Sequence, residues 1–146
     1  MKKIYITFPK NFSFWAINLF GVAFINMRQK EFLEKNQILY NRLIDHERIH
    51  SEQGRELLWI FFYLLYVLEW LFRLIQYRNA KTVDGKKDRK AAYRNISFER
   101  EAFAKEHDTL YREYRKRFAF LKYLWKILQA CNDLYFRQFF IKKTVY

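Results

Sequence analysis

The sequence predicts an α+β domain that is mostly helical, with a small β element near its N-terminus. Only three glycines and one proline occur among 146 residues, so the frequent turns of a many-stranded β fold are missing. Apolar residues form 51% of the chain, which is enough for a core and excludes wholesale disorder. The length fits a single domain over residues 1–146.

Strand signals are confined to about residues 1–26. Residues 1–8 alternate weakly between polar and apolar side chains, as a strand does. Residues 14–26 are rich in aromatic and β-branched side chains on both sides of Gly21. This composition predicts one or two short strands.

Helical spacing follows from Gln29 onward. As far as Gly54, apolar residues recur every three or four positions among charged ones, and Asn36 is placed to cap a second helix after a short break. We therefore expect a helix over about 36–54 and an apolar helix over about 55–77.

The apolar helix has two interpretations. Its uninterrupted apolar run over 57–68 is 12 residues long, whereas a bilayer span needs about 20. We expect a buried core helix that shelters Trp59, Phe62 and Tyr66, with a membrane-embedded or interfacial helix as the alternative.

The second half of the chain begins with a linker. Residues 78–95 contain a dense basic run and the turn signal Asp84-Gly85, which favour a solvated loop. A new helix is expected near Ser97, where acidic residues fall in the first turn, and to continue through 111–114 into 115–128. The C-terminal helices are expected within 96–146.

Charge is distributed unevenly over the chain. The net charge is +13, of which residues 1–77 carry +3 (10 basic minus 7 acidic) and residues 78–146 carry +10 (18 minus 8). Such a basic half can contact nucleic acid or an anionic membrane, or can simply form a solvated exterior. Its interleaved rings and basic groups are more typical of an amphipathic helix than of base stacking, so nucleic acid is not an expected partner.

The sequence also bears on compartment. Cys131 is alone, so neither a disulfide framework nor a cysteine metal site is expected. The N-terminal stretch lacks a long apolar run followed by a small-residue cleavage site. We expect a cytoplasmic protein, with membrane association as the alternative.

The decisive motif is His-Glu-Arg-Ile-His over residues 46–50. Histidines four apart on a helix project from one face, so His46 and His50 can bind one metal ion. Glu47 lies beside that face, where it can take a proton from metal-bound water. The chain has only three histidines, and two of them fall in this pattern.

A catalytic zinc needs three protein ligands and an open position for water. The remaining histidine, His107, lies in an exposed-looking Lys-Glu-His-Asp stretch. Glu99 is the better third ligand, because Ala102 follows at i+3 and lets its helix pack closely against the histidine helix. Glu101 is expected to point away when Glu99 points in.

These two elements, residues 46–50 and Glu99-Arg100-Glu101-Ala102, resemble the gluzincin metallopeptidases and their short single-domain forms, the minigluzincins. They also resemble a group of small bacterial proteins with a His-Glu-Arg-Ile-His-like helix. The resemblance implies a zincin-like fold in which His46, His50 and Glu99 bind zinc and Glu47 is the general base. Several gluzincin families carry Asp after the alanine as a partner to a histidine, where this chain has Phe103.

The expected function is therefore that of a small zinc metallopeptidase that hydrolyses peptide bonds through a zinc-activated water. Similar zincins lay the substrate along an edge strand, for which residues 20–26 are the natural choice. Tyr93, Arg94 and His107 come into consideration as oxyanion donors, although each is expected at the surface. The alternative is a non-catalytic zinc-binding protein whose basic, aromatic C-terminal half binds a membrane surface or a protein partner.

Overall fold

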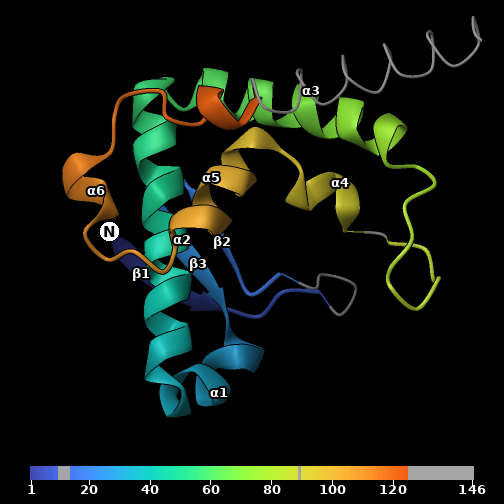
Figure 1. The fold of residues 1–146 in the computed structure, drawn as a ribbon. Helices are drawn as coiled ribbons and strands as arrows, with labels where there is room; N and C mark the ends of the chain where they lie inside the picture. The colour runs from blue at the N-terminus through green and yellow to red at the C-terminus, as the bar shows by residue number, and fades with distance from the viewer. Residues whose placement is uncertain (10–13, 89, 125–146) are drawn as a thin grey trace, which may run out of the picture.

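The computed structural model describes residues 1–9, 14–88 and 90–124 and has an α+β fold (Figure 1). Within these residues a small sheet lies beside a set of helices, of which α2 and α3 are the longest. The elements in chain order are β1 (Lys2–Ile6), β2 (Ala16–Leu19), β3 (Val22–Asn26), the 3-10 turn η1 (Met27–Gln29), α1 (Lys30–Lys35), α2 (Gln37–Glu56), α3 (Ile60–Gln76), α4 (Ala91–Arg94), α5 (Ser97–Lys105) and α6 (Tyr111–Tyr114).

The sheet has the order β1-β3-β2. β3 pairs in parallel with β1 and antiparallel with β2, so both of its edges are occupied. The β2–β3 hairpin turns at Phe20 and Gly21, whose φ angles of 49° and 79° fit the twist of a tight two-residue turn. The expectation that residues 20–26 form the edge strand is therefore wrong, and β2 is the exposed edge on that side.

The helix α2 lies against the sheet and is anchored to β2. The buried amide of Asn18 donates hydrogen bonds to the Glu47 carbonyl oxygen at 2.7 Å and to Ser51 Oγ at 2.8 Å. α2 buries its C-terminal half, which carries the histidine motif. The hairpin thus fixes the position of residues 46–50 along β2.

A sharp bend separates α2 from α3, which cross at 112°. Leu58 and Trp59 between them have φ angles of 53° and 57°, a left-handed conformation that ends the helix. The Trp59 ring then folds back over Gly54, which has no side chain to obstruct it. α3 consequently runs across the end of α2, above α4 and α5 (Figure 1).

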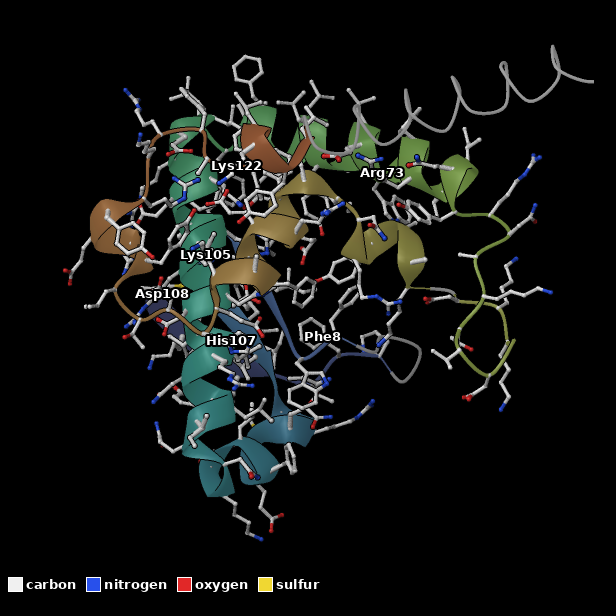
Figure 2. The ribbon with its side chains drawn as sticks, in the orientation of Figure 1. Phe8, Arg73, Lys105, His107, Asp108 and Lys122 are labelled. Carbon is white, nitrogen blue, oxygen red and sulfur yellow. The ribbon has the colours of Figure 1, made fainter. Side chains whose placement is uncertain are left out.

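The expectation that α3 is a buried core helix is wrong for most of its surface. Phe62 and Arg73 are its buried residues, and Tyr66 is partly buried on the same side. Arg73 points beneath α3 toward α4 (Figure 2), where it pairs with Glu69 at 2.8 Å. The opposite side of α3 is apolar and exposed. Among the described residues, no single helix has both the length and the apolar character needed to cross a bilayer.

The chain after α3 departs from the expected pattern in two places. The segment 78–95 contains an isolated bridge between Lys81 and Lys87 and ends in the short helix α4. The helix expected from Ser97 through 111–128 instead breaks after Lys105 and again after α6. Residues 125–128 lie outside the described part of the chain.

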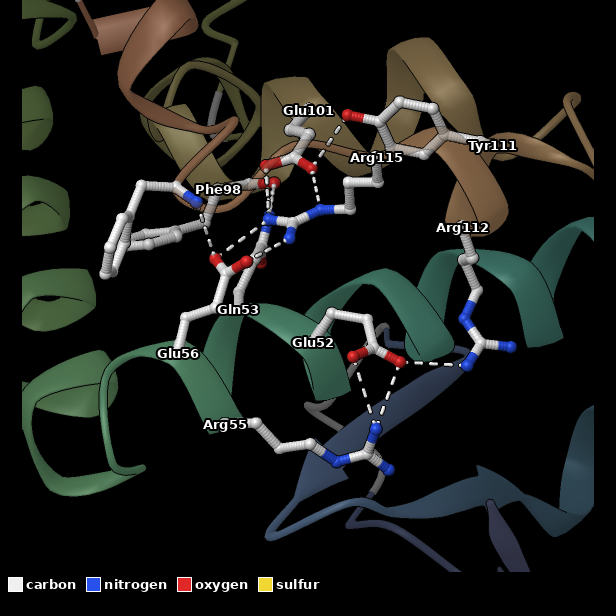
Figure 3. Close-up of polar contacts among 10 residues, drawn as sticks. Glu52, Gln53, Arg55, Glu56, Phe98, Glu101, Tyr111, Arg112 and Arg115 are labelled. Carbon is white, nitrogen blue, oxygen red and sulfur yellow. Dashed lines mark hydrogen bonds and ion pairs between the residues drawn. The ribbon is translucent and has the colours of Figure 1, made fainter.

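The second break has a clear physical cause. Arg115 adopts an extended backbone and directs its guanidinium into a buried group of carboxylates, where it contacts both Glu56 of α2 and Glu101 of α5 (Figure 3). A continued helix would carry this charge away from both partners. The tertiary ion pair therefore overrides the local helical preference.

Candidate metal centre

The predicted ligands His46, His50 and Glu99 converge in the buried space between α2 and α5. The Nε2 atoms of the two histidines are 3.1 Å apart. Glu99 Oε2 lies 3.3 Å from His46 Nε2, and Glu99 Oε1 lies 3.2 Å from His50 Nε2. One ligand atom from each residue falls within 4.8 Å of the others, so the group can hold a single metal ion.

Close packing of the two helices brings the third ligand into place. Ala102 is fully buried and packs with Ile49 of α2 and with Tyr111. A larger side chain at position 102 would separate the helices and withdraw Glu99 from the histidines. The start of α5 is fixed by Glu69 of α3, whose carboxylate accepts hydrogen bonds from Ser97 N at 3.0 Å and Ser97 Oγ at 2.6 Å.

The outer nitrogens of both histidines have oxygen acceptors. His46 Nδ1 lies 3.0 Å from Glu106 Oε2, and His50 Nδ1 lies 2.7 Å from Gln53 Oε1. Both Nδ1 atoms must therefore carry hydrogen, and in the neutral ring the Nε2 lone pair remains free to bind a metal. This is the tautomer that metal binding through Nε2 requires.

The orientation of Gln53 is itself determined by its surroundings. Its Nε2 donates to the Phe98 carbonyl oxygen and to Glu101 Oε2, both at 3.1 Å, which leaves Oε1 facing His50. Glu101 also accepts hydrogen bonds from Tyr111 and Arg115 (Figure 3). Glu101 thus points away from the metal ligands, as expected, yet it is fully buried and supports the site through Gln53.

The charges of the group are strongly coupled. Burial raises the pKa of Glu99, but the two adjacent histidines outweigh burial and hold that pKa far below its usual range. Burial lowers the pKa of His46, but the hydrogen bond with Glu106 and the adjacent carboxylate of Glu99 outweigh burial and raise the pKa to about 10. The metal-free site therefore keeps a carboxylate beside imidazolium, and a metal ion would take the place of the protons.

The donor set fits a metal ion such as zinc. Two imidazole nitrogens and one carboxylate oxygen form a common set for a catalytic zinc that also binds water. Within the described part of the chain, the buried Glu99 Oε2 has no hydrogen bond of good geometry, although His46 Nε2 lies 3.3 Å away. A buried carboxylate oxygen without a hydrogen bond is costly, and a bound cation would satisfy it.

Glu47 lies next to this group. Its side chain is 4% exposed, and Oε2 has no hydrogen-bond partner among the described residues. Burial raises the pKa of the Glu47 carboxyl, although the two histidines act against the rise. A buried carboxyl therefore borders the three candidate metal ligands.

Two neighbouring cavities give access to Glu47. The larger, of about 730 Å³, is lined by His46 and Glu47 together with the aromatic side chains Phe14, Trp15, Tyr66, Trp70, Tyr93 and Phe103. The smaller, of about 250 Å³, is bordered by the whole of β2 and by Glu47, His50 and Glu99. The edge strand, the metal ligands and Glu47 thus face common space.

Two tyrosines lie close to Glu99 in this space. Tyr66 OH donates to Glu99 Oε1 at 2.7 Å. Burial, and then the charge of Glu99, raises the pKa of Tyr66 and of Tyr93 well above the usual value, so both phenols keep their protons. The expectation of a surface position is wrong for Tyr93, which is partly buried and lines both cavities.

His107 and Phe103, two other positions considered from the sequence, lie outside the ligand group. His107 is exposed at the end of α5, next to Asp108 (Figure 2), and takes no part in the ligand group. Phe103 packs its ring against His46, with centroids 4.7 Å apart, and the carboxylate that His46 Nδ1 faces belongs to Glu106.

Three residues of the site were not predicted from the sequence: Gln53, Tyr66 and Glu106. A signal for Glu106 exists, because Glu99, Ala102 and Glu106 follow the 3-4 spacing of one helix face. No comparable local signal marks Gln53 or Tyr66, whose roles depend on how α2, α3 and α5 meet.

Fold and geometry define an α+β protein with a buried His-His-Glu group that can hold a metal ion. Compared with protein-family models, curated proteins and solved structures, the chain matches none.

Proposed function

We propose that this protein is a small zinc-dependent metallopeptidase. The observation that carries the proposal is the position of Glu47, a buried carboxyl with one oxygen that has no partner among the described residues, beside three residues that could hold a metal ion. A structural metal site has no need of such a group, because its ligands close around the ion. A hydrolytic site needs a base at this place.

His46, His50 and Glu99 would hold the ion. A bound zinc lowers the pKa of its water toward about 7 and polarises a substrate carbonyl. Glu47 would take the proton of that water and deliver it to the leaving amine. Burial raises the pKa of the Glu47 carboxyl above its ordinary value, which makes it a better proton acceptor than an exposed carboxylate.

Tyr93 is the residue best placed to donate a hydrogen bond to the developing oxyanion. It lines both cavities, and burial keeps its hydroxyl protonated by raising its pKa. Both tyrosines contact Glu99, and Tyr66, which donates to Glu99 Oε1 at 2.7 Å, would hold that residue in orientation. The assignment of Tyr93 replaces the surface position expected for it.

The substrate is proposed to be an extended peptide. Among the described residues no strand pairs with the outer edge of β2, and β2 borders the smaller cavity over its entire length, so a peptide paired with β2 would lie beside Glu47 and the proposed ligands. The aromatic lining of the larger cavity suits a bulky apolar side chain of such a peptide.

The test compares Glu47→Gln with Glu52→Gln. Both remove one carboxylate from α2, but Glu52 pairs with Arg55 and Arg112 away from the ligands. We expect wild type and both variants to bind about one zinc per chain by elemental analysis. Glu47→Gln should lose cleavage of a mixed peptide library by about a hundredfold or more, while Glu52→Gln keeps it.

Three results would overturn the proposal. They are a wild-type protein that binds zinc but cleaves no peptide in the library, a Glu47→Gln variant that turns over like wild type, and a chain that retains no metal.

A further inference from the structure

The outer face of α3 is unusual for a helix that is packed on a protein. Side chains at 61, 64, 65, 68, 72 and 75 follow the 3-4 spacing of one face, and those at 60, 67, 71 and 74 extend it. Eleven large apolar residues of α3 are exposed, with values from 39% for Trp70 to 72% for Ile60: Ile60, Phe61, Leu64, Leu65, Val67, Leu68, Trp70, Leu71, Phe72, Leu74 and Ile75.

This patch is larger than the surface of a monomer normally tolerates. A large side chain offers roughly 150–200 Å², so eleven half-exposed ones present on the order of 1,000 Å². The largest apolar patch of a typical monomer is about 300–600 Å². We therefore expect the outer face of α3 to be covered by a partner.

The inner face of α3 fixes this orientation. Phe62 packs in a buried cluster with Phe98 and Phe120, and Glu69 caps α5 through Ser97. Arg73 is 1% exposed and is held by Glu69 and Gln76. Because the inner face carries the polar and aromatic contacts, α3 cannot rotate to bury its outer face without breaking them.

Positive charge flanks the patch at its C-terminal end. Residues 78–94 contain seven basic and two acidic side chains. One of the acids, Asp88, already pairs with Arg94. Lys81, Lys86 and Lys87 are exposed in the loop that follows α3 (Figure 1). An apolar helix face with adjoining lysines is complementary to an anionic lipid surface.

We infer that α3 docks this protein on an anionic membrane, lying in the plane of the interface. At 1.5 Å per residue the 17 residues of α3 reach about 26 Å, less than the about 30 Å of the hydrocarbon core. If α3 crossed the bilayer, its inner face would also have to lose its contacts with α5. A second copy of the chain fits less well, because it would bring a second basic segment and another +13 charge to the patch.

Docking would bring the larger cavity close to the headgroups. Trp70 of α3 and Lys90 of the basic segment both line that cavity. The inference itself does not depend on the proposed peptidase activity, since lipid binding is measured without a substrate.

The test is co-sedimentation of the full chain with vesicles of phosphatidylcholine and phosphatidylglycerol at three to one. The variant Leu64→Glu/Leu68→Glu alters the outer face, and Phe32→Glu/Ile38→Glu is the control, because it places two identical charges on exposed apolar positions of α1 and α2. We expect wild type to sediment with these vesicles, and several-fold less with pure phosphatidylcholine. The α3 variant should bind at least about tenfold more weakly, with the control within about twofold of wild type.

Other outcomes would overturn the inference. An equal loss of vesicle binding in both variants would mean that binding depends on net charge alone. Unchanged binding of the α3 variant would mean that the outer face of α3 is not the membrane-binding surface. A lipid-free dimer that only the α3 variant dissociates would make a second copy the occupant. A melting temperature lowered in the α3 variant alone, without lipid, would mean that the face is covered by the chain itself.

Discussion

Gly54 lies two residues before the end of α2, beneath the ring of Trp59. A Cβ atom built at this position would lie 2.4 Å from two atoms of the ring and 2.9 Å from a third, well inside van der Waals contact. The ring has little freedom to retreat, because it also packs on Phe20, Phe62 and Tyr63. The substitution Gly54→Ala therefore sets helix propensity against packing.

The two effects have opposite signs. Alanine stabilises a helix interior by about 1 kcal/mol relative to glycine. Overpacking of a confined site costs about 1–3 kcal/mol, and three clashing atoms of a ring held on several sides place Gly54→Ala in the upper part of that range. We expect a net loss of about 1–2 kcal/mol, which lowers the melting temperature by about 3–7 °C for a chain of this size.

A double-mutant cycle in thermal denaturation, followed by circular dichroism, separates the two effects. In the Trp59→Leu background the clash is gone, so Gly54→Ala should become neutral or stabilising by up to about 1 kcal/mol. The reasoning is refuted if Gly54→Ala stabilises the wild-type background, or if its effect is the same in both backgrounds.

Three further predictions concern the metal site and its support. Glu106→Ala should weaken zinc binding about 10–100-fold in a chelator competition, because His46 loses its acceptor; an unchanged affinity would contradict this role. Zinc binding near pH 7 should release protons, since the pKa of His46 is raised to about 10, and affinity should grow as pH rises toward that value. Calorimetry in buffers of different ionisation enthalpy measures this proton release. An absence of proton release would mean that His46 is already neutral in the metal-free protein. Arg115→Met should cost about 3–5 kcal/mol in urea denaturation, because it leaves Glu101 buried without its cation; a loss below about 1 kcal/mol would refute this.

The local part of the site could be predicted from the sequence. Helix geometry alone places His46 and His50 on one face, and the structure brings their Nε2 atoms to 3.1 Å. Glu99 was identified through the small residue Ala102, and its carboxylate does lie against both rings. These predictions succeeded because each needed only the spacing within one helix.

The incorrect predictions have a different cause in common, namely contacts between residues that are distant in the sequence. The edge strand was assigned wrongly because β1, which lies about twenty residues earlier in the sequence, pairs with β3. No local sequence pattern predicts that pairing. The helix expected through residues 111–128 breaks where Arg115 reaches Glu56, 59 positions away. The exposure of α3 was not predicted because its polar residues Glu69, Arg73 and Gln76 share the face that points into the protein, whereas a polar helix face normally marks the solvent side.

The helix α3 joins the two surfaces on which this protein is proposed to act. Its inner side places Tyr66 OH 2.7 Å from Glu99 and caps α5 through Glu69, so the third proposed metal ligand is positioned in part by α3. Its outer side is the apolar face proposed to meet lipid. The contact with Glu99 and the proposed lipid-binding face both belong to one short helix, which lies at 112° to α2. A displacement of α3 on a membrane would therefore move the groups that contact Glu99. The left-handed Leu58-Trp59 turn and the buried Arg73–Glu69 pair both oppose such a displacement. They keep the ligand geometry independent of what covers the outer face.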